Sequence, residues 1–327
     1  MKEFRSFLTP QIRSFIRYRQ ASGRWNDSSY EENLMLFDHY CHENYTNTDA
    51  LTQEMVDSWC RQRDTEENNS CRSRIYVVVS FIRFLNERGL SEVRMPQIPR
   101  KERRTYIPHA FTDEELARFF HECDSIPLCG NRKDCLVRKL TLPVFFRLLY
   151  SSGIRTNEAR LLKREDVDLE CGILDIRYSK GHDQHYIALH DSMLEVMRDY
   201  DMAIGKIVLQ RAYFFPSIRN SHYNRNWVIK NFRLLWYKVN TSHATAYEFR
   251  HHYAVMNINR WISQGFDFHD KLLYLSKSMG HTTIESTKYY YSIVPGLSQI
   301  LKEQTEESSD WMIPEVPGDE ETDKGKH

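Results

Sequence analysis

The chain has 327 residues, enough for two domains, and 41% of them are hydrophobic. Its apolar runs are shorter than the roughly 18 residues that a membrane-spanning helix needs. Its first residues alternate in polarity, unlike a signal peptide. We therefore expect a soluble, cytoplasmic protein and not a membrane protein.

The formal net charge of zero hides an uneven distribution of charge. Residues 303–327 carry nine acids and two lysines, which leaves a charge of about +7 on the rest of the chain. An excess of that size is a modest footprint for binding a phosphate backbone, and many soluble domains share it.

In chain order, residues 1–92 are predicted to form four short helices. Apolar residues recur every three or four positions, as from Ile75 to Leu85, and Gly89 suits the end of the last helix. The pattern predicts a compact all-α domain. The last helix also carries three arginines, which form either a solvated face or a face that contacts DNA: Arg72, Arg74 and Arg83.

Residues 93–110 are predicted to be an extended linker between two domains. Pro96, Pro99 and Pro108 disfavour a helix there. Four basic residues accompany the prolines, and they are typical either of a segment lying on DNA or of an ordinary exposed linker: Arg100, Lys101, Arg103 and Arg104.

Residues 111–295 are predicted to form a second, mainly helical domain with a small antiparallel β element. Acids in the first turn mark a helix that starts near Thr112. Residues 173–179 and 185–189 alternate in polarity on either side of a turn, as the strands of a β-hairpin do. The acidic stretch after residue 303 is expected to be disordered.

Five short motifs of this second domain are weak singly and indicate one chemistry together. An arginine follows Gly153 at a turn, a lysine lies near the hairpin tip, and a Tyr-x-x-Arg-His sequence opens a later helix. A Gly-His pair then precedes a tyrosine by nine residues. The side chains with reactive chemistry are Arg155, Lys180, Tyr247, Arg250, His281 and Tyr290.

These side chains suit phosphoryl transfer from DNA to a tyrosine. Two guanidiniums can hold the non-bridging oxygens of a phosphodiester, as a metal ion does in other enzymes. A tyrosine hydroxyl has a pKa of about 10, so it needs such a field to attack near neutral pH. A lysine can protonate the leaving 5′-oxygen, and we predict a reaction without cofactor or metal.

The motifs resemble those of the tyrosine recombinases, which include phage integrases and Xer-type recombinases, over about residues 111–294. That family combines Gly-[Ile/Leu]-Arg-x-x-Glu, a hairpin lysine, His-x-[Leu/Phe]-Arg-His, Gly-His and a tyrosine nine residues later. The resemblance implies that Tyr290 is the nucleophile and Lys180 the general acid. It also implies that the scissile phosphate is bound by Arg155, Arg250 and His281.

The resemblance further implies a site-specific recombinase that cleaves and rejoins DNA through a 3′-phosphotyrosyl intermediate. Its task would be integration, excision or transposition of a mobile element. The first domain would be the family's SAM-like core-binding domain, and the two domains would grip duplex DNA as a C-shaped clamp. Four protomers would join two duplexes, each docking its segment 296–327 into a neighbour, alone or with a partner recombinase.

The chain departs from the family at one position. Tyr247 stands where the family has a histidine, and it can donate a hydrogen bond to a phosphate oxygen but accepts protons poorly. Glu158 matches the family's structural acid. We expect His251 to support the site from behind, because adjacent His251 and His252 point to different sides of a helix and do not suit a metal site.

Two alternatives stay open at this point. A type IB topoisomerase uses the same chemistry as a monomer and relaxes DNA without a recombination site. A DNA-binding regulator of the same fold would have lost catalysis, and Tyr247 is the only hint of it.

Overall fold

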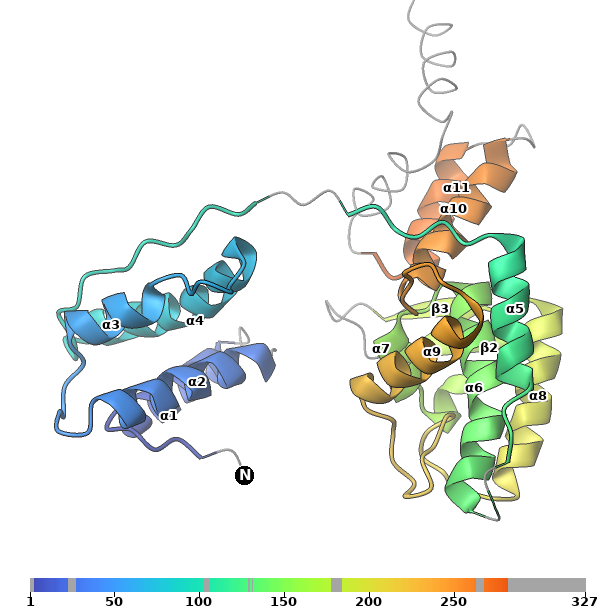
Figure 1. Cartoon of the computed structure of the whole chain (residues 1–327), viewed down its shortest axis with the longest axis horizontal. Coiled ribbons are helices and arrows are strands. Elements are labelled where there is room, and N and C mark those ends of the chain that lie inside the picture. Colours follow the sequence, from blue (N-terminus) through green and yellow to red (C-terminus); the bar gives the residue numbers. More distant parts are fainter. Residues whose placement is uncertain are drawn as a thin grey trace, which may run out of the picture. The chain divides into compact units, whose positions relative to one another are not determined.

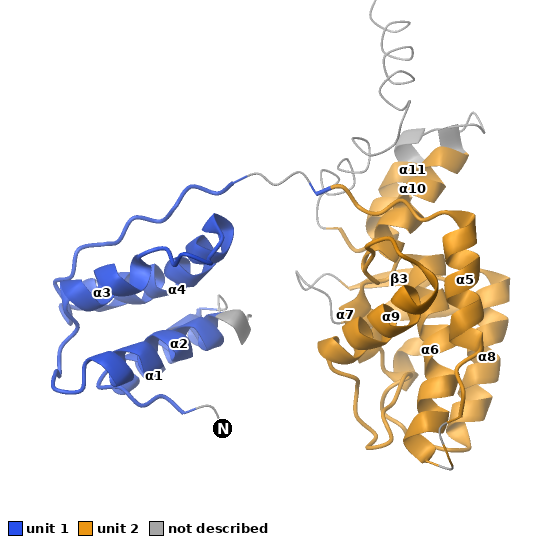
Figure 2. Ribbon diagram, viewed as in Figure 1, with its two compact units in different colours: residues 1–106 blue, residues 107–327 orange. Residues whose placement is uncertain are grey.

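The computed structural model describes residues 3–22, 28–102, 106–128, 130, 132–177, 184–262 and 268–281. They belong to two compact units, residues 1–106 and 107–327, drawn in blue and orange in Figure 2. In the described ranges unit 1 is built from helices, and unit 2 combines helices with a three-stranded antiparallel sheet. This confirms the predicted fold class. None of the helices in these ranges has the length and apolarity required to cross a membrane.

Unit 1 contains the four helices that the sequence predicts (Figure 1). The side chain of Thr52 caps the third helix by accepting an N–H of its first turn. Aromatic rings from all four helices fill the core, where Phe15 packs against Phe81 and Phe37 against Trp59. The helices are α1 (Thr9–Ala21), α2 (Ser28–Asn44), α3 (Gln53–Cys60) and α4 (Asn68–Asn86).

Residues 93–102, which the sequence assigns to the linker, are bonded to the start of α4. Asn68 donates a side-chain hydrogen bond to the carbonyl of Arg100. The amide of Asn69 donates to the carbonyl of Glu102 and accepts from its N–H. This stretch is therefore fixed to unit 1, although its prolines do keep it out of a helix.

Unit 2 contains the predicted hairpin, in which β2 (Ile173–Ile176) pairs antiparallel with β3 (His185–Ala188). A two-residue strand, β1 (Val167–Asp168), adds to the free side of β2 after a short 3-10 turn, Arg164–Asp166. The helices are α5 (Asp113–Asp124), α6 (Lys133–Ser152), α7 (Thr156–Leu161), α8 (Asp191–Gly205), α9 (Arg225–Val239), α10 (Glu248–Ile262) and α11 (Phe268–Ser278).

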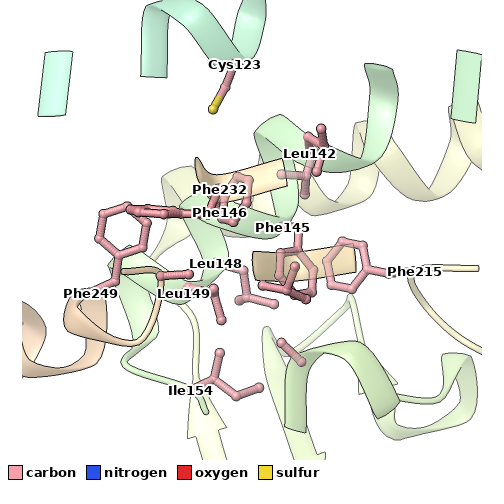
Figure 3. Close-up of a cluster of buried hydrophobic side chains, with 14 of the residues drawn as sticks. Cys123, Leu142, Phe145, Phe146, Leu148, Leu149, Ile154, Phe215, Phe232 and Phe249 are labelled. Carbon is pink, nitrogen blue, oxygen red and sulfur yellow. The ribbon is translucent and has the colours of Figure 1, made fainter. Parts of the chain in front are cut away.

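The core of unit 2 is aromatic, and α6 contributes its centre. This helix packs against α5, α7, α8 and α10. Its Phe145 and Phe146 are buried among rings from later elements, Phe215, Phe232 and Phe249 (Figure 3). Each buried ring removes a large apolar area from water. The packing fixes the end of α6, which leads into the turn of Arg155, and the start of α10, which carries Arg250.

Candidate active site

The first predicted arginine lies on a turn that is fixed on both sides. α6 ends at Gly153, whose φ of +64° is the left-handed conformation that favours glycine. A Cβ at this position would be 2.5 Å from the ring of Tyr253. Arg155 follows as the N-cap of α7, so its side chain starts from a backbone with little freedom.

The buried carboxylate of Glu158 holds Arg155 in two ways. Its Oε2 accepts the backbone N–H of Arg155 at 3.0 Å, and its Oε1 accepts Nη1 of the guanidinium at 2.5 Å. The other end of the guanidinium, Nη2, donates to the carbonyl oxygen of Gly280 at 2.8 Å. Arg155 is thereby tied both to its own helix and to the turn after α11.

Arg250 joins the same two turns from within α10, where it is only 2% exposed. Its Nη1 donates to the carbonyl of Gly153 at 2.7 Å, and its Nη2 donates to the carbonyl of Met279 at 2.5 Å. Nη2 also lies 3.0 Å from Nε2 of His281, and this ring nitrogen is the acceptor because arginine only donates. The three predicted phosphate-binding residues thus come together from α7, α10 and the end of α11.

His281 is neutral near physiological pH. Burial, followed by repulsion from Arg250 and Arg155, lowers the pKa of His281 to about 4. Its backbone N–H donates to the carbonyl of Ser276, while Gly280 takes a left-handed φ of +61° that closes α11. The cluster therefore combines two guanidiniums, one carboxylate and a neutral imidazole, and it favours an anion.

His185 is a buried neighbour of this cluster that was not among the residues predicted from the sequence. It starts β3 on the inward face of the strand, which it shares with Ile187. Its Nε2 lies 3.9 Å from Oε2 of Glu158. The signal for it was a polar residue at an inward position of an alternating strand.

Tyr247 lies just before α10 and is 44% exposed. Its ring contacts that of His251 edge to face, with 5.2 Å between the ring centroids. His251 is buried, and burial lowers its pKa. The structure therefore places the predicted supporting histidine behind Tyr247. Among the described residues no group of three or more His, Cys, Asp or Glu side chains is placed to hold a metal ion.

A hollow of about 240 Å³ opens beside Tyr247, between α7 and α9. Its lining contains three arginines and no carboxylate. Arg160 is held in it by the side chain of Asn157 and the carbonyl of Tyr223. These arginines were not predicted as site residues, although the absence of acids from residues 225–239 was a signal. The polar lining of this basic hollow consists of Thr156, Asn157, Arg160, Arg225, Arg233, Thr245 and Tyr247.

Two predicted catalytic residues, Lys180 and Tyr290, lie outside the described residues. So do Arg103 and Arg104. The strands that flank the loop of Lys180 are described, as β2 and β3.

The prediction that Arg74 contacts DNA is wrong. Its side chain is 6% exposed and its guanidinium is paired with the carboxylate of Glu66, with Nε to Oε1 at 2.7 Å. It also donates to the carbonyls of Trp59 and Arg61. Arg74 lies one helical turn from Cys71 and from Val78, which are both fully buried, so the periodicity of α4 places it on the buried face. Only its charge suggested an exposed position.

The other described residues predicted to contact DNA remain at or near the surface. Arg72 is partly buried and donates to the carbonyl of Pro99. The side chains that are exposed are Arg83, Arg100 and Lys101.

Comparison with known proteins places the chain in a family. Residues 110–295 match the model of the phage integrase family. A Sinorhizobium fredii protein named as an integrase/recombinase, y4rB, is 25% identical over 309 residues, which are 89% of this chain and 94% of the relative. The tyrosine recombinase XerC of Chlamydia trachomatis is 23% identical over 243 residues, which are 72% of this chain and 70% of the relative.

Solved structures share the fold at lower sequence identity. The XerH recombinase bound to difH substrate in a pre-cleavage complex has a TM-score of 0.57 at 15% identity, over 92% of this chain and 84% of XerH. The Tn1549 transposon integrase in complex with transposon right end DNA has a TM-score of 0.57 at 13% identity, over 90% of this chain and 98% of the integrase. Since the family model spans more than half of its length, the chain belongs to the phage integrase family and is a tyrosine-type site-specific recombinase, as its motifs predict.

Proposed function

We propose that this recombinase cleaves a DNA strand by attack of Tyr290 on a phosphodiester and rejoins it from a 3′-phosphotyrosyl intermediate. The observation that carries this proposal is the meeting of Arg155, Arg250 and His281 at two adjoining turns. Hydrogen bonds to backbone carbonyls fix both guanidiniums there. A phosphate at this cluster would meet donors that need no rearrangement, which is the arrangement that stabilises a transition state best.

Each side chain has its own task in the proposed reaction. Arg155 and Arg250 bind the non-bridging oxygens and stabilise the charge that develops as Tyr290 attacks. Tyr290 releases its phenolic proton to solvent as its oxygen bonds to phosphorus, and it takes a proton back on religation. His281 accepts from Arg250 through Nε2, so its proton is on Nδ1 and can be donated to the phosphate. Lys180 protonates the leaving 5′-oxygen and recovers the proton on religation. The phosphotyrosyl bond keeps the energy for religation, so the reaction needs no cofactor.

Residues around this centre bind the rest of the substrate in the same proposal. Glu158 keeps Arg155 in place, and Tyr247 donates from its hydroxyl to a non-bridging oxygen. The basic hollow takes backbone phosphates next to the scissile one, because it combines three arginines with no carboxylate. Unit 1 acts as the core-binding domain and contributes Arg83, Arg100 and Lys101.

The biological task that we infer is integration, excision or transposition of a mobile element. Support comes from what the similar structures hold: XerH with difH, and the Tn1549 integrase with a transposon end. Lambda integrase was solved as a dimer on a core site and as a tetramer on a Holliday junction. By analogy, four protomers act here on two duplexes, joined through residues 296–327, alone or with a partner recombinase.

A trapped covalent adduct tests the reaction. The flanking DNA of the gene is first sequenced to identify inverted repeats around a short spacer. The substrate is a duplex with that sequence and a nick, so that cleavage cannot be reversed. The wild-type protein should form an adduct that survives denaturation, and EDTA should not reduce its yield. Tyr290→Phe should still bind the duplex and form no adduct, while Tyr289→Phe and Tyr291→Phe serve as controls. If the adduct persists in Tyr290→Phe and disappears in one of the controls, the nucleophile is the tyrosine replaced in that control.

The same proteins separate the two rival functions. A type IB topoisomerase would relax supercoiled plasmid that carries no recombination site, and a regulator would bind the duplex without forming an adduct. We expect neither result from the wild-type chain.

A further inference from the structure

His185 packs flat against the turn that follows α11. A Cβ added to Gly280 would lie 2.5 Å from Cε1 of the His185 ring, 2.7 Å from Nδ1 and 2.9 Å from Nε2. Side-chain atoms do not approach that closely, so the imidazole occupies the space in which any other residue at position 280 would place its side chain. The ring and the glycine backbone are therefore in direct contact, and β3 packs against α11 at this point.

Both groups that orient Arg155 meet His185. The carbonyl oxygen of Gly280 accepts the hydrogen bond from Nη2 of Arg155 at 2.8 Å. The carboxylate of Glu158 accepts from the backbone and from Nη1 of Arg155, and its Oε2 is 3.9 Å from Nε2 of His185. A flat ring with a polar edge suits this position, because one face contacts a glycine and the edge faces a carboxylate.

We propose that His185 is a positioning residue for Arg155, and that it couples the β2–β3 hairpin to the phosphate-binding cluster. The ring sets the position of the Gly280 carbonyl and limits the movement of Glu158, and both in turn hold the guanidinium. Because β3 follows the loop that contains Lys180, one strand links the arginine to the hairpin of the general acid. This inference rests on the proposed function, since it assigns His185 a part in the same reaction.

The first test is the rate of single-turnover cleavage by the full chain. With the nicked duplex at saturating concentration, His185→Ala should form the adduct at least tenfold more slowly than the wild type. The dissociation constant for the duplex should change less than twofold. His185→Gln, which keeps a polar group but not the ring, should recover only part of the rate. Tyr186→Ala is the matched control, because the neighbouring side chain is 62% exposed, and it should cleave at the wild-type rate.

Stability is measured alongside the rate. A residue that acts only through global stability would lower the melting temperature and leave the rate unchanged at temperatures where the protein is folded. That pattern, or wild-type cleavage by His185→Ala, overturns the positioning role.

The second test is a double-mutant cycle with Gly280→Ala. In the wild-type background the new Cβ must displace the ring and also accept a left-handed backbone. In the His185→Ala background only the backbone strain remains, so the same substitution should lower the cleavage rate and the urea midpoint much less. Equal losses in both backgrounds overturn the inference, even if the wild type cleaves well. If the wild type forms no adduct, the proposed function fails, and the catalytic part of the inference fails with it.

Discussion

At the scale of single residues, Arg155 and Arg250 owe their positions to backbone carbonyls and not to acidic partners alone. Gly153, Met279 and Gly280 each supply one carbonyl oxygen to a guanidinium. Carbonyls orient a guanidinium without cancelling its charge. The carbonyls therefore remove conformational freedom from the two side chains in advance without reducing their attraction for a phosphate.

This geometry predicts that Arg250→Lys is a severe change. Lysine keeps the charge, but it cannot reach two carbonyls and a phosphate at once from one planar group. Cleavage of the nicked duplex should slow by about 100- to 1,000-fold, the loss typical of removing one preorganised donor. Arg219→Lys is the control, because Arg219 is exposed and far from the cluster in sequence. Near-normal cleavage by Arg250→Lys would show that the guanidinium of Arg250 does not take part in the reaction.

Tyr247 should contribute one hydrogen bond to the bound phosphate. Tyr247→Phe keeps the ring contact with His251 and loses only the hydroxyl, so the expected cost is roughly 1.5–3 kcal/mol, or about ten- to a hundredfold in single-turnover rate. Tyr247→His should retain activity. Tyr237→Phe is the control on the exposed side of α9. If Tyr247→Phe cleaves at the wild-type rate, Tyr247 is a packing residue.

The lowered pKa of His281 predicts a loss of stability in mild acid. Its pKa is about 4 in the folded protein and about 6.5 when unfolded, so between these values the unfolded chain binds a proton that the folded chain does not. The part of the free energy of unfolding that depends on neutral His281 is fully present above pH 6.5 and is lost as the pH falls toward 4. After solvent screening, the loss should be on the order of 1 kcal/mol by pH 5.

Urea unfolding at pH 7 and pH 5 measures this effect. His281→Gln should lose less stability than the wild type between the two pH values. The pKa values of His251 and His252 are also lowered by burial, but both residues are present in each protein, so their contribution cancels. An identical loss in both proteins would contradict the assignment of a neutral His281.

At the scale of elements, sequence patterns predicted the features that depend on residues close together in the chain. The hairpin followed from alternating polarity, and α5 followed from acids in its first turn, which form a capping box with Thr112. The order of the motifs also identified the arginines of the cluster. The basic hollow could not be predicted in this way, because it joins α7 to α9 through contacts such as that of Arg160 with the carbonyl of Tyr223. His185 was missed for the same reason, since its partners lie on other elements.

The arginines of α4 show that position on the helix, and not residue type, decides which of them is buried, and they give a prediction. Arg74→Met should destabilise unit 1 by about 3 kcal/mol, because it leaves the partly buried carboxylate of Glu66 without its partner and the carbonyls of Trp59 and Arg61 without their donor. Arg83→Met should change stability by less than about 0.5 kcal/mol, because Arg83 is exposed, and should weaken DNA binding instead. Thermal unfolding and DNA titration of both variants distinguish the two roles. Weaker DNA binding by Arg74→Met at unchanged stability would restore the original prediction.

At the scale of the whole molecule, the net charge is zero, but basic and acidic residues are unevenly distributed along the chain. The chain has 45 basic and 45 acidic residues, and the acids gather toward its C-terminal end. Affinity for DNA must then come from a few basic surfaces, and α9 is the strongest of those described, because residues 225–239 contain four basic residues and no acid. Each contact that neutralises a phosphate releases counterions, so the number of contacts can be read from the salt dependence of binding.

The basic hollow should account for a measurable part of that dependence. Replacing Arg225 and Arg233 by Gln removes two charges from its wall without touching the Arg155 cluster. The slope of log K against log salt concentration should become shallower by about 2, since each phosphate contact contributes roughly 0.9. Titration of a duplex between 50 and 200 mM salt, roughly the range in which such slopes are resolved, measures it.

Arg132→Gln is the matched control, because Arg132 is exposed and already paired with Asp134, so its loss should leave the slope unchanged. If the double variant keeps the wild-type slope, the hollow does not contact phosphates, and the DNA must follow another surface of unit 2. If the slope changes while the rate of single-turnover cleavage at saturating DNA stays the same, these arginines act in binding only. Their distance in sequence from the catalytic motifs predicts that role.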